Sequence, residues 1–265
     1  MRYFKLVNKV GFYILKNYYK WMKPYGKHPE RVPFETRYNR FRKFLKVFNE
    51  RVGVSLYVKG KENIPNDVCF FAPNHQGFLD PLMLVDIVDK PTSFVGKVEV
   101  QKYPFVNYAF KGLDGLFLER DNLRTSIKII RQVEQSLIAD EKSWGIFPEG
   151  TRTRNKDFEL NDFHAGTFKI ALDSKKPIVP VAIFGTSRVL DPHLNYNKYP
   201  VQVSFLKPIL YDEYKDMNTI ELAKMVENIV REEVYRMRDL EVELFTKENP
   251  NNKLKKLLKL KASSR

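Results

Sequence analysis

Short apolar segments alternate with amphipathic segments between residues 54 and 245, and this alternation limits the chain to a small set of folds. Segments with the length and composition of strands cover residues 54–58, 68–72, 93–96, 116–118, 144–147, 178–184 and 201–206. Segments with helical spacing cover residues 81–88, 122–139, 165–172 and 219–245. This order predicts an α/β fold, with a central mixed sheet flanked by helices. Pro180 lies inside a predicted strand and favours an edge position or a bulge there.

The positive charge of the chain is concentrated at its two ends. The net charge is +14, yet residues 1–60 alone contain fifteen Lys and Arg against three acids. The tail from Lys253 adds six basic residues and no acid. The stretch between the ends is therefore slightly acidic. Basic ends of this kind favour a polyanionic partner, either a nucleic acid or an anionic membrane surface.

The pattern in residues 3–22 favours the membrane. On a helical wheel Lys5, Lys9, Lys16 and Lys20 fall within a wedge of roughly 60°, and aromatic and aliphatic residues fill much of the remaining circumference. A narrow charged strip beside a broad apolar face is typical of a helix that lies in a bilayer interface, and no nucleic-acid partner is expected. The alternative is an amphipathic helix packed on its own domain. A second segment after Pro33 repeats the mixture of aromatic and basic residues.

These observations predict that the chain has three regions, and they also predict where in the cell the protein is located. Residues 1–53 form an N-terminal amphipathic two-helix segment that binds membranes, residues 54–248 an α/β domain, and residues 249–265 a basic tail. The lysines interrupt every run that could span a bilayer, so we expect a peripheral protein at the cytoplasmic face of the cell membrane. Cys69 is the single cysteine, which fits a reducing compartment, and its apolar neighbours indicate an inert, buried thiol.

Residues 74–80, Asn-His-Gln-Gly-Phe-Leu-Asp, follow one predicted strand and lead into a helix. His75 and Asp80 are five residues apart, and across a strand-to-helix turn the carboxylate can fold back onto the imidazole. A carboxylate that accepts from one ring nitrogen leaves the other nitrogen free to take a proton, which makes His75 a candidate general base for a hydroxyl. The alternative is that Asp80, followed by Pro81, only caps the helix.

Basic and polar residues follow three other predicted strands. They are Lys97, Arg120 and the run Glu149, Gly150, Thr151 and Arg152. In an α/β sheet, functional side chains gather where strands end at their carboxyl ends. Arginines, a hydroxyl and backbone N–H groups next to a glycine are the donors that a substrate phosphate needs. The sequence therefore predicts a phosphate site beside the His75–Asp80 pair, with Glu149 in position to hold an arginine.

Four segments in this order resemble the 1-acyl-sn-glycerol-3-phosphate acyltransferase family, the glycerolipid acyltransferases with a His-x4-Asp motif. The resemblance covers roughly residues 55–210, and its four blocks are 74–80, 115–120, 147–152 and 178–183. Lys97 also matches a lysine of the family. Three positions differ from the commoner pattern. Gly77 stands where many members have serine, Glu119 replaces aspartate, and His164 lies where the family often has a basic residue.

The resemblance implies transfer of an acyl chain from a thioester of acyl carrier protein or coenzyme A to the hydroxyl of a lysophosphatidic acid, which gives phosphatidic acid. His75 would be the base and Asp80 would orient it. Lys97, Arg120, Glu149, Gly150, Thr151 and Arg152 would bind the phosphate. No acyl-enzyme intermediate is needed, because the thioester is already activated. No metal or other cofactor is expected.

Three alternatives remain open. The first is an acyltransferase for glycerol 3-phosphate or another lysolipid, and the second is a basic membrane- or nucleic-acid-binding protein without activity. The third, a metal hydrolase built on His75 and Asp80, is weakest because no second histidine accompanies the pair.

Overall fold

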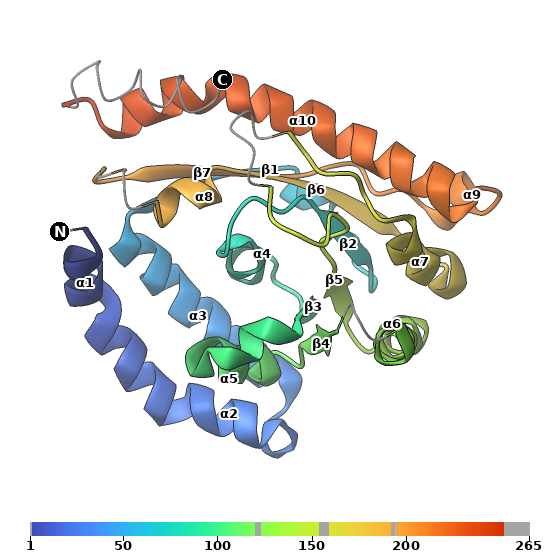
Figure 1. The fold of residues 1–265 in the computed structure, drawn as a ribbon, viewed down its shortest axis with the longest axis horizontal. Helices are drawn as coiled ribbons and strands as arrows, with labels where there is room; N and C mark the ends of the chain where they lie inside the picture. The colour runs from blue at the N-terminus through green and yellow to red at the C-terminus, as the bar shows by residue number, and fades with distance from the viewer. Residues whose placement is uncertain (1, 120–122, 154–158, 192–193, 195, 252–265) are drawn as a thin grey trace.

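The computed structural model describes residues 2–119, 123–153, 159–191, 194 and 196–251. A seven-stranded sheet forms its centre, and helices cover both faces (Figure 1). The strands are β1 (Val54–Lys59), β2 (Phe70–Pro73), β3 (Thr92–Lys97), β4 (Leu116–Leu118), β5 (Ser143–Gly145), β6 (Ile178–Phe184) and β7 (Tyr199–Phe205). The order across the sheet is β1-β7-β6-β2-β5-β3-β4. Only the β6–β7 pair is antiparallel, so the predicted mixed α/β sheet is confirmed.

Ten α-helices surround the sheet within the described residues. They are α1 (Arg2–Asn17), α2 (Lys23–Lys27), α3 (Phe34–Val52), α4 (Asp80–Ile87), α5 (Pro104–Gly112), α6 (Leu123–Ile138), α7 (Lys169–Ser174), α8 (Thr186–Val189), α9 (Tyr211–Tyr214) and the long α10 (Thr219–Glu248). A π-helical turn, η1 (Tyr18–Met22), joins α1 to α2. Short 3₁₀ turns η2 (Pro29–Arg31), η3 (Lys61–Asn63), η4 (Val98–Lys102) and η5 (Ala165–Phe168) complete the order.

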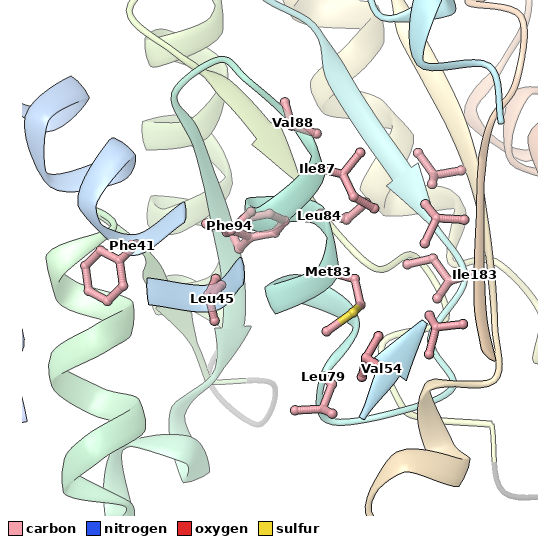
Figure 2. Packing of buried hydrophobic residues seen from close by; sticks show 14 of the residues in the cluster. Phe41, Leu45, Val54, Leu79, Met83, Leu84, Ile87, Val88, Phe94 and Ile183 are labelled. Atoms are coloured by element: carbon pink, nitrogen blue, oxygen red, sulfur yellow. The ribbon is translucent and has the colours of Figure 1, made fainter. Parts of the chain in front are cut away.

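Alternating side chains of β6 enter two different cores. Val179, Val181 and Ile183 pack with the residues of α3 and α4 on one face of the sheet. Ile178, Ala182 and Phe184 pack with α7 and α10 on the other face. This is the two-residue period of a strand buried on both sides. Figure 2 shows the first core, where Ile183 lies near Met83 and Leu84 of α4.

The N-terminal helices belong to the first core. Trp21 is buried in edge-to-face contact with Phe41 and Phe44 of α3, at ring-centroid distances of 4.8 and 5.8 Å. Buried Arg37 of α3 donates to the carbonyl of Gly112 at the end of α5 (2.5 Å) and to the Asp114 carboxylate (2.8 Å). The two-helix segment expected from the sequence is therefore present and packs firmly on the α/β domain. Within the described part of the chain, no helix has the length and apolarity that crossing a bilayer requires.

The strand with Pro180 is central, so the expected edge position is wrong, but a bulge lies at this point. β6 sits between β7 and β2. Val181 follows Ile178 by three positions, whereas their partners Phe205 and Ile209 are four positions apart. The extra residue opposite Pro180 interrupts the ladder, and a proline can occupy an interior strand where a ladder bond is missing.

Candidate active site

The loop between β2 and α4 is held in place by its own side chains. β2 ends at Pro73, and the buried Asn74 amide bonds both backbone groups of Ile183 on β6, donating to its carbonyl (3.0 Å) and accepting from its N–H (2.7 Å). The chain then turns, and α4 begins at Asp80 with Pro81 in its first turn. A proline in that position suits a helix start, because its nitrogen has no hydrogen to leave unpaired.

His75 and Asp80 meet across this turn. His75 Nδ1 lies 2.7 Å from Asp80 Oδ2. The imidazole packs against the ring of Phe147, with the ring centroids 4.4 Å apart and the ring planes tilted by 35°. Asp80 is fully buried, whereas the His75 side chain is one-fifth exposed. An ionised carboxylate only accepts hydrogen bonds, so Nδ1 carries the proton and Nε2 is left as the basic nitrogen.

Asp80 does not cap α4. Its carboxylate Oδ2 accepts from the backbone N–H groups of Gln76 (2.7 Å) and Gly77 (2.8 Å), and Oδ1 accepts from the hydroxyl of Thr186. With the His75 bond, the carboxylate has four donors. These bonds compensate the loss of water around a buried carboxylate and fix its plane. The alternative reading of Asp80 as a helix cap therefore has no hydrogen bond in the structure to support it.

Glu149 lies behind the loop, where it contacts no arginine of the described chain. Its side chain is buried, with Oε1 accepting from the His75 N–H (2.6 Å) and Oε2 from the Thr153 hydroxyl (2.7 Å). Oε2 also accepts from the N–H and the side-chain amide of Asn161, at 2.9 and 2.8 Å. Burial raises the pKa of Glu149, and these hydrogen bonds oppose the rise. The structure thus places Glu149 as a brace for His75, in contrast to the expected role of holding an arginine.

An apolar cavity of about 400 Å³ opens beside the His75 ring. Its walls come from four elements, represented by Leu82 of α4, Phe94 of β3, Phe110 of α5 and Ile130 of α6. Lys97, Thr151, Arg152 and His164 also line this cavity. The cavity therefore combines a largely apolar wall with two cations and the candidate base.

The structure brings most of the predicted site residues to this one cavity. His75, Lys97, Gly150, Thr151 and Arg152 line it, and Asp80 and Glu149 support it from behind. Gly150 has a φ of +61°, which suits glycine in the tight turn after β5. Arg120 lies outside the described residues. Thr186 contacts Asp80 and Asn161 contacts Glu149. Neither Thr186 nor Asn161 belongs to a motif that would predict this role from the sequence.

Comparisons with known proteins identify the family to which the chain is similar. Residues 55–184 match the family model described as Acyltransferase. The chain is 29% identical, over 223 residues, to a probable 1-acyl-sn-glycerol-3-phosphate acyltransferase of Mycoplasma pneumoniae, which covers 79% of this chain and 81% of that protein. It is 30% identical, over 168 residues, to the 1-acyl-sn-glycerol-3-phosphate acyltransferase of Saccharomyces cerevisiae, with 63% of this chain and 55% of the relative covered.

The fold is also that of a solved acyltransferase. The crystal structure of the 1-acyl-sn-glycerophosphate acyltransferase PlsC from Thermotoga maritima superposes with a TM-score of 0.71, at 23% sequence identity. The match covers 90% of this chain and 98% of that chain. The family match, the two relatives and the fold lead to one conclusion: the chain belongs to the 1-acyl-sn-glycerol-3-phosphate acyltransferase family and is an acyltransferase.

Proposed function

We propose that the protein transfers a fatty acyl group from a thioester, carried by acyl carrier protein or coenzyme A, to the free hydroxyl of 1-acyl-sn-glycerol 3-phosphate. The product is phosphatidic acid. The observation that carries this proposal is the position of the His75–Asp80 pair beside an apolar cavity that Lys97 and Arg152 also line. The pair can activate a hydroxyl, the cavity can accept an alkyl chain, and the cations suit a phosphate.

The proposed reaction uses the free nitrogen of His75. Nε2 takes the proton of the acceptor hydroxyl while the hydroxyl oxygen attacks the thioester carbonyl carbon. The tetrahedral intermediate then collapses, the carbon–sulfur bond breaks, and the leaving thiolate takes the proton back from Nε2. Asp80 keeps its hydrogen bond to Nδ1 throughout and stabilises the imidazolium. Since the thioester is already activated, a covalent acyl-enzyme is unnecessary.

A single variant tests the role of His75. We expect His75→Ala to lower kcat with lysophosphatidic acid by about a thousandfold or more, because a general base and its supporting carboxylate act as one unit. The thermal unfolding midpoint should change little, since the ring is partly exposed. Activity within a few-fold of the wild-type protein would refute the mechanism.

The substrates require a second experiment. Lysophosphatidic acid, glycerol 3-phosphate and lysophosphatidylcholine are offered as acceptors, each with acyl carrier protein and coenzyme A thioesters. We expect the highest kcat/KM with lysophosphatidic acid. A higher kcat/KM with glycerol 3-phosphate or lysophosphatidylcholine would make that acceptor the substrate. If no donor and acceptor pair leads to thioester consumption, a binding protein without activity is favoured.

We further propose that the enzyme works at the cytoplasmic face of the membrane as a peripheral protein. Support comes from the N-terminal helices, where Phe12, Leu15 and Tyr19 are 78%, 55% and 63% exposed. On the helical wheel these three side chains fall within a wedge of roughly 60°, next to the lysine strip. Exposed apolar side chains beside lysines suit an anionic lipid surface. The basic tail beyond residue 251 lies outside the described residues.

A further inference from the structure

The end of β6 and the start of α8 form hydrogen bonds with the loop between β2 and α4, which contains His75. Asn74 bonds both backbone groups of Ile183, and Gln76 Oε1 accepts from the N–H of Gly185 at 3.0 Å. The third contact is the hydroxyl of Thr186, which donates to Asp80 Oδ1. All of these side chains are buried. A segment more than a hundred residues away in sequence therefore sets the shape of the loop that contains His75.

Thr186 and Gly77 occupy the same small space. A Cβ atom added to Gly77 would lie 2.7 Å from Thr186 Oγ1 and 3.0 Å from the backbone nitrogen of Ser187. The distance to Oγ1 is shorter than real Cβ atoms show, and the distance to the Ser187 nitrogen is tighter than most Cβ contacts. A side chain at position 77 would push the Thr186 hydroxyl away from Asp80. The glycine in the motif is thus explained by its neighbour, because only glycine leaves room for this hydrogen bond.

The position of Thr186 is itself fixed. Gly185 has a φ of +96°, and Arg188 in the same turn forms a buried ion pair with Glu241 of α10, with Arg188 Nε 2.8 Å from Glu241 Oε1. An ion pair of this kind resists displacement, because separating the two side chains would leave each buried charge without its partner. The hydroxyl of Thr186 is therefore presented to Asp80 by a rigid support.

We propose that Thr186 is a positioning residue of the acyl transfer reaction, and that Gly77 is its required partner. Thr186 is not among the residues that line the apolar cavity beside His75. Its hydroxyl holds Asp80 Oδ1, so that Oδ2 faces His75 Nδ1 and the ring keeps its Nε2 directed to the acceptor hydroxyl. This inference rests on the proposed role of His75 as the general base, and it goes beyond that role by naming the residues that keep the base aligned.

Three variants of one turn test the proposal. Thr186→Val keeps the shape and removes the hydroxyl, Thr186→Ser restores a hydroxyl, and Ser187→Ala is the matched control, since the Ser187 hydroxyl has no hydrogen-bond partner among the described residues. We expect Thr186→Val to lower kcat about ten- to a hundredfold, with KM for donor and acceptor unchanged. Thr186→Ser should recover most of kcat, and Ser187→Ala should match the wild-type protein. A Thr186→Val enzyme with normal kcat would overturn the proposal, as would a loss that appears in KM.

A spectroscopic measurement keeps the test independent of the substrate. The proton on His75 Nδ1, hydrogen-bonded to Asp80, is observed by NMR in protein labelled with ¹⁵N-histidine, and His75→Gln assigns its signal. We expect this signal to shift or broaden in Thr186→Val and to return in Thr186→Ser. If the wild-type protein proves inactive on lysophosphatidic acid, the proposed function fails, but this signal still decides the positioning role. An unchanged signal in a folded Thr186→Val protein would overturn it.

The glycine is tested in a double-mutant cycle. Gly77→Ser alone should lower kcat, because the new side chain displaces the Thr186 hydroxyl. In a Thr186→Ala background the shortest clash is gone and a serine hydroxyl at position 77 can reach the space beside Asp80. We therefore expect Gly77→Ser to cost much less, or to raise kcat, in that background. Equal losses in both backgrounds would show that Gly77 and Thr186 act separately and would overturn their pairing.

Discussion

Glu149 stabilises the catalytic loop through its hydrogen bonds to the backbone of His75 and to Thr153 and Asn161. Replacing it with glutamine exchanges one accepting oxygen for an NH₂ group that faces other donors. We expect Glu149→Gln to lower the free energy of unfolding by about 1–3 kcal/mol and to reduce kcat, because His75 loses its backbone anchor. KM for the acceptor should stay nearly constant. Urea unfolding and steady-state kinetics measure both effects, and a rise in KM alone would instead place Glu149 at the phosphate.

Cys69 offers a second prediction at the level of one residue. Its side chain is 1% exposed, and burial raises the pKa of the thiol to about 12. Because the thiolate is the reactive form, the folded protein should resist iodoacetamide at pH 8 and react quickly in urea. As Cys69 is the single cysteine, the labelled fraction, read by mass spectrometry, reports unfolding directly. Rapid labelling of the native protein would contradict the burial.

At the scale of elements, α8 and α10 are joined by the pair of Arg188 and Glu241, and both side chains are only 4% exposed. Removing one charge of a buried pair leaves the other without its partner, so we expect Glu241→Ala to lower the free energy of unfolding by about 3–5 kcal/mol. Replacing both residues with methionine should cost much less, because no buried charge remains. Urea unfolding of the single and double variants makes the comparison, and equal losses in both would assign the effect to packing.

Elements with a clear period were predictable from the sequence, and the cavity was not. β4 and β6 match the predicted ranges, and α6 and α10 lie within three residues of them at each end. α5 (Pro104–Gly112) had no distinct signal, because its nine residues are largely apolar and too few to show a helical period. This helix supplies Phe105, Ala109 and Phe110 to the cavity wall, so the acyl site could not be drawn before the fold was known.

The contact between His75 and Asp80 was predictable from the sequence because the two residues are close along the chain. The hydrogen bond from Thr186 that holds Asp80 was not predictable. Five residues and one turn connect the two side chains, so local chemistry limits how they can meet. Thr186 reaches Asp80 from 106 residues away, and that contact depends on the pairing of β2 with β6. The role of Glu149 also depends on burial, since its place in a motif gives no sign of whether the carboxylate faces a substrate or the protein backbone.

At the scale of the whole molecule, the N-terminal helices bury one side in the core and expose apolar side chains and lysines on the other. Trp21 and Met22 are buried together with residues of α3 and α4, while Lys16 and Lys20 stay exposed. The alternative interpretation, a helix packed on its own domain, is therefore confirmed for the buried side of this segment, and membrane binding stays a prediction. Deleting residues 1–33 would remove buried side chains from the core, so a loss of lipid binding in that variant could reflect unfolding. Substitutions confined to the exposed strip avoid this problem.

The strip of Phe12, Leu15 and Tyr19 should decide whether the protein binds lipid. We expect the triple replacement of these residues with serine to weaken binding to vesicles of phosphatidylcholine and phosphatidylglycerol by at least about tenfold, because exposed apolar side chains lose their place in the bilayer interface. Ile220→Ser is the matched control, since Ile220 is 70% exposed at the start of α10, across the molecule from α1 (Figure 1). Vesicle co-sedimentation measures both proteins, and their unfolding midpoints should equal that of the wild-type protein. If the triple variant binds as well as Ile220→Ser does, the membrane-binding surface lies elsewhere, and the lysine strip beside it would no longer indicate a lipid-facing side.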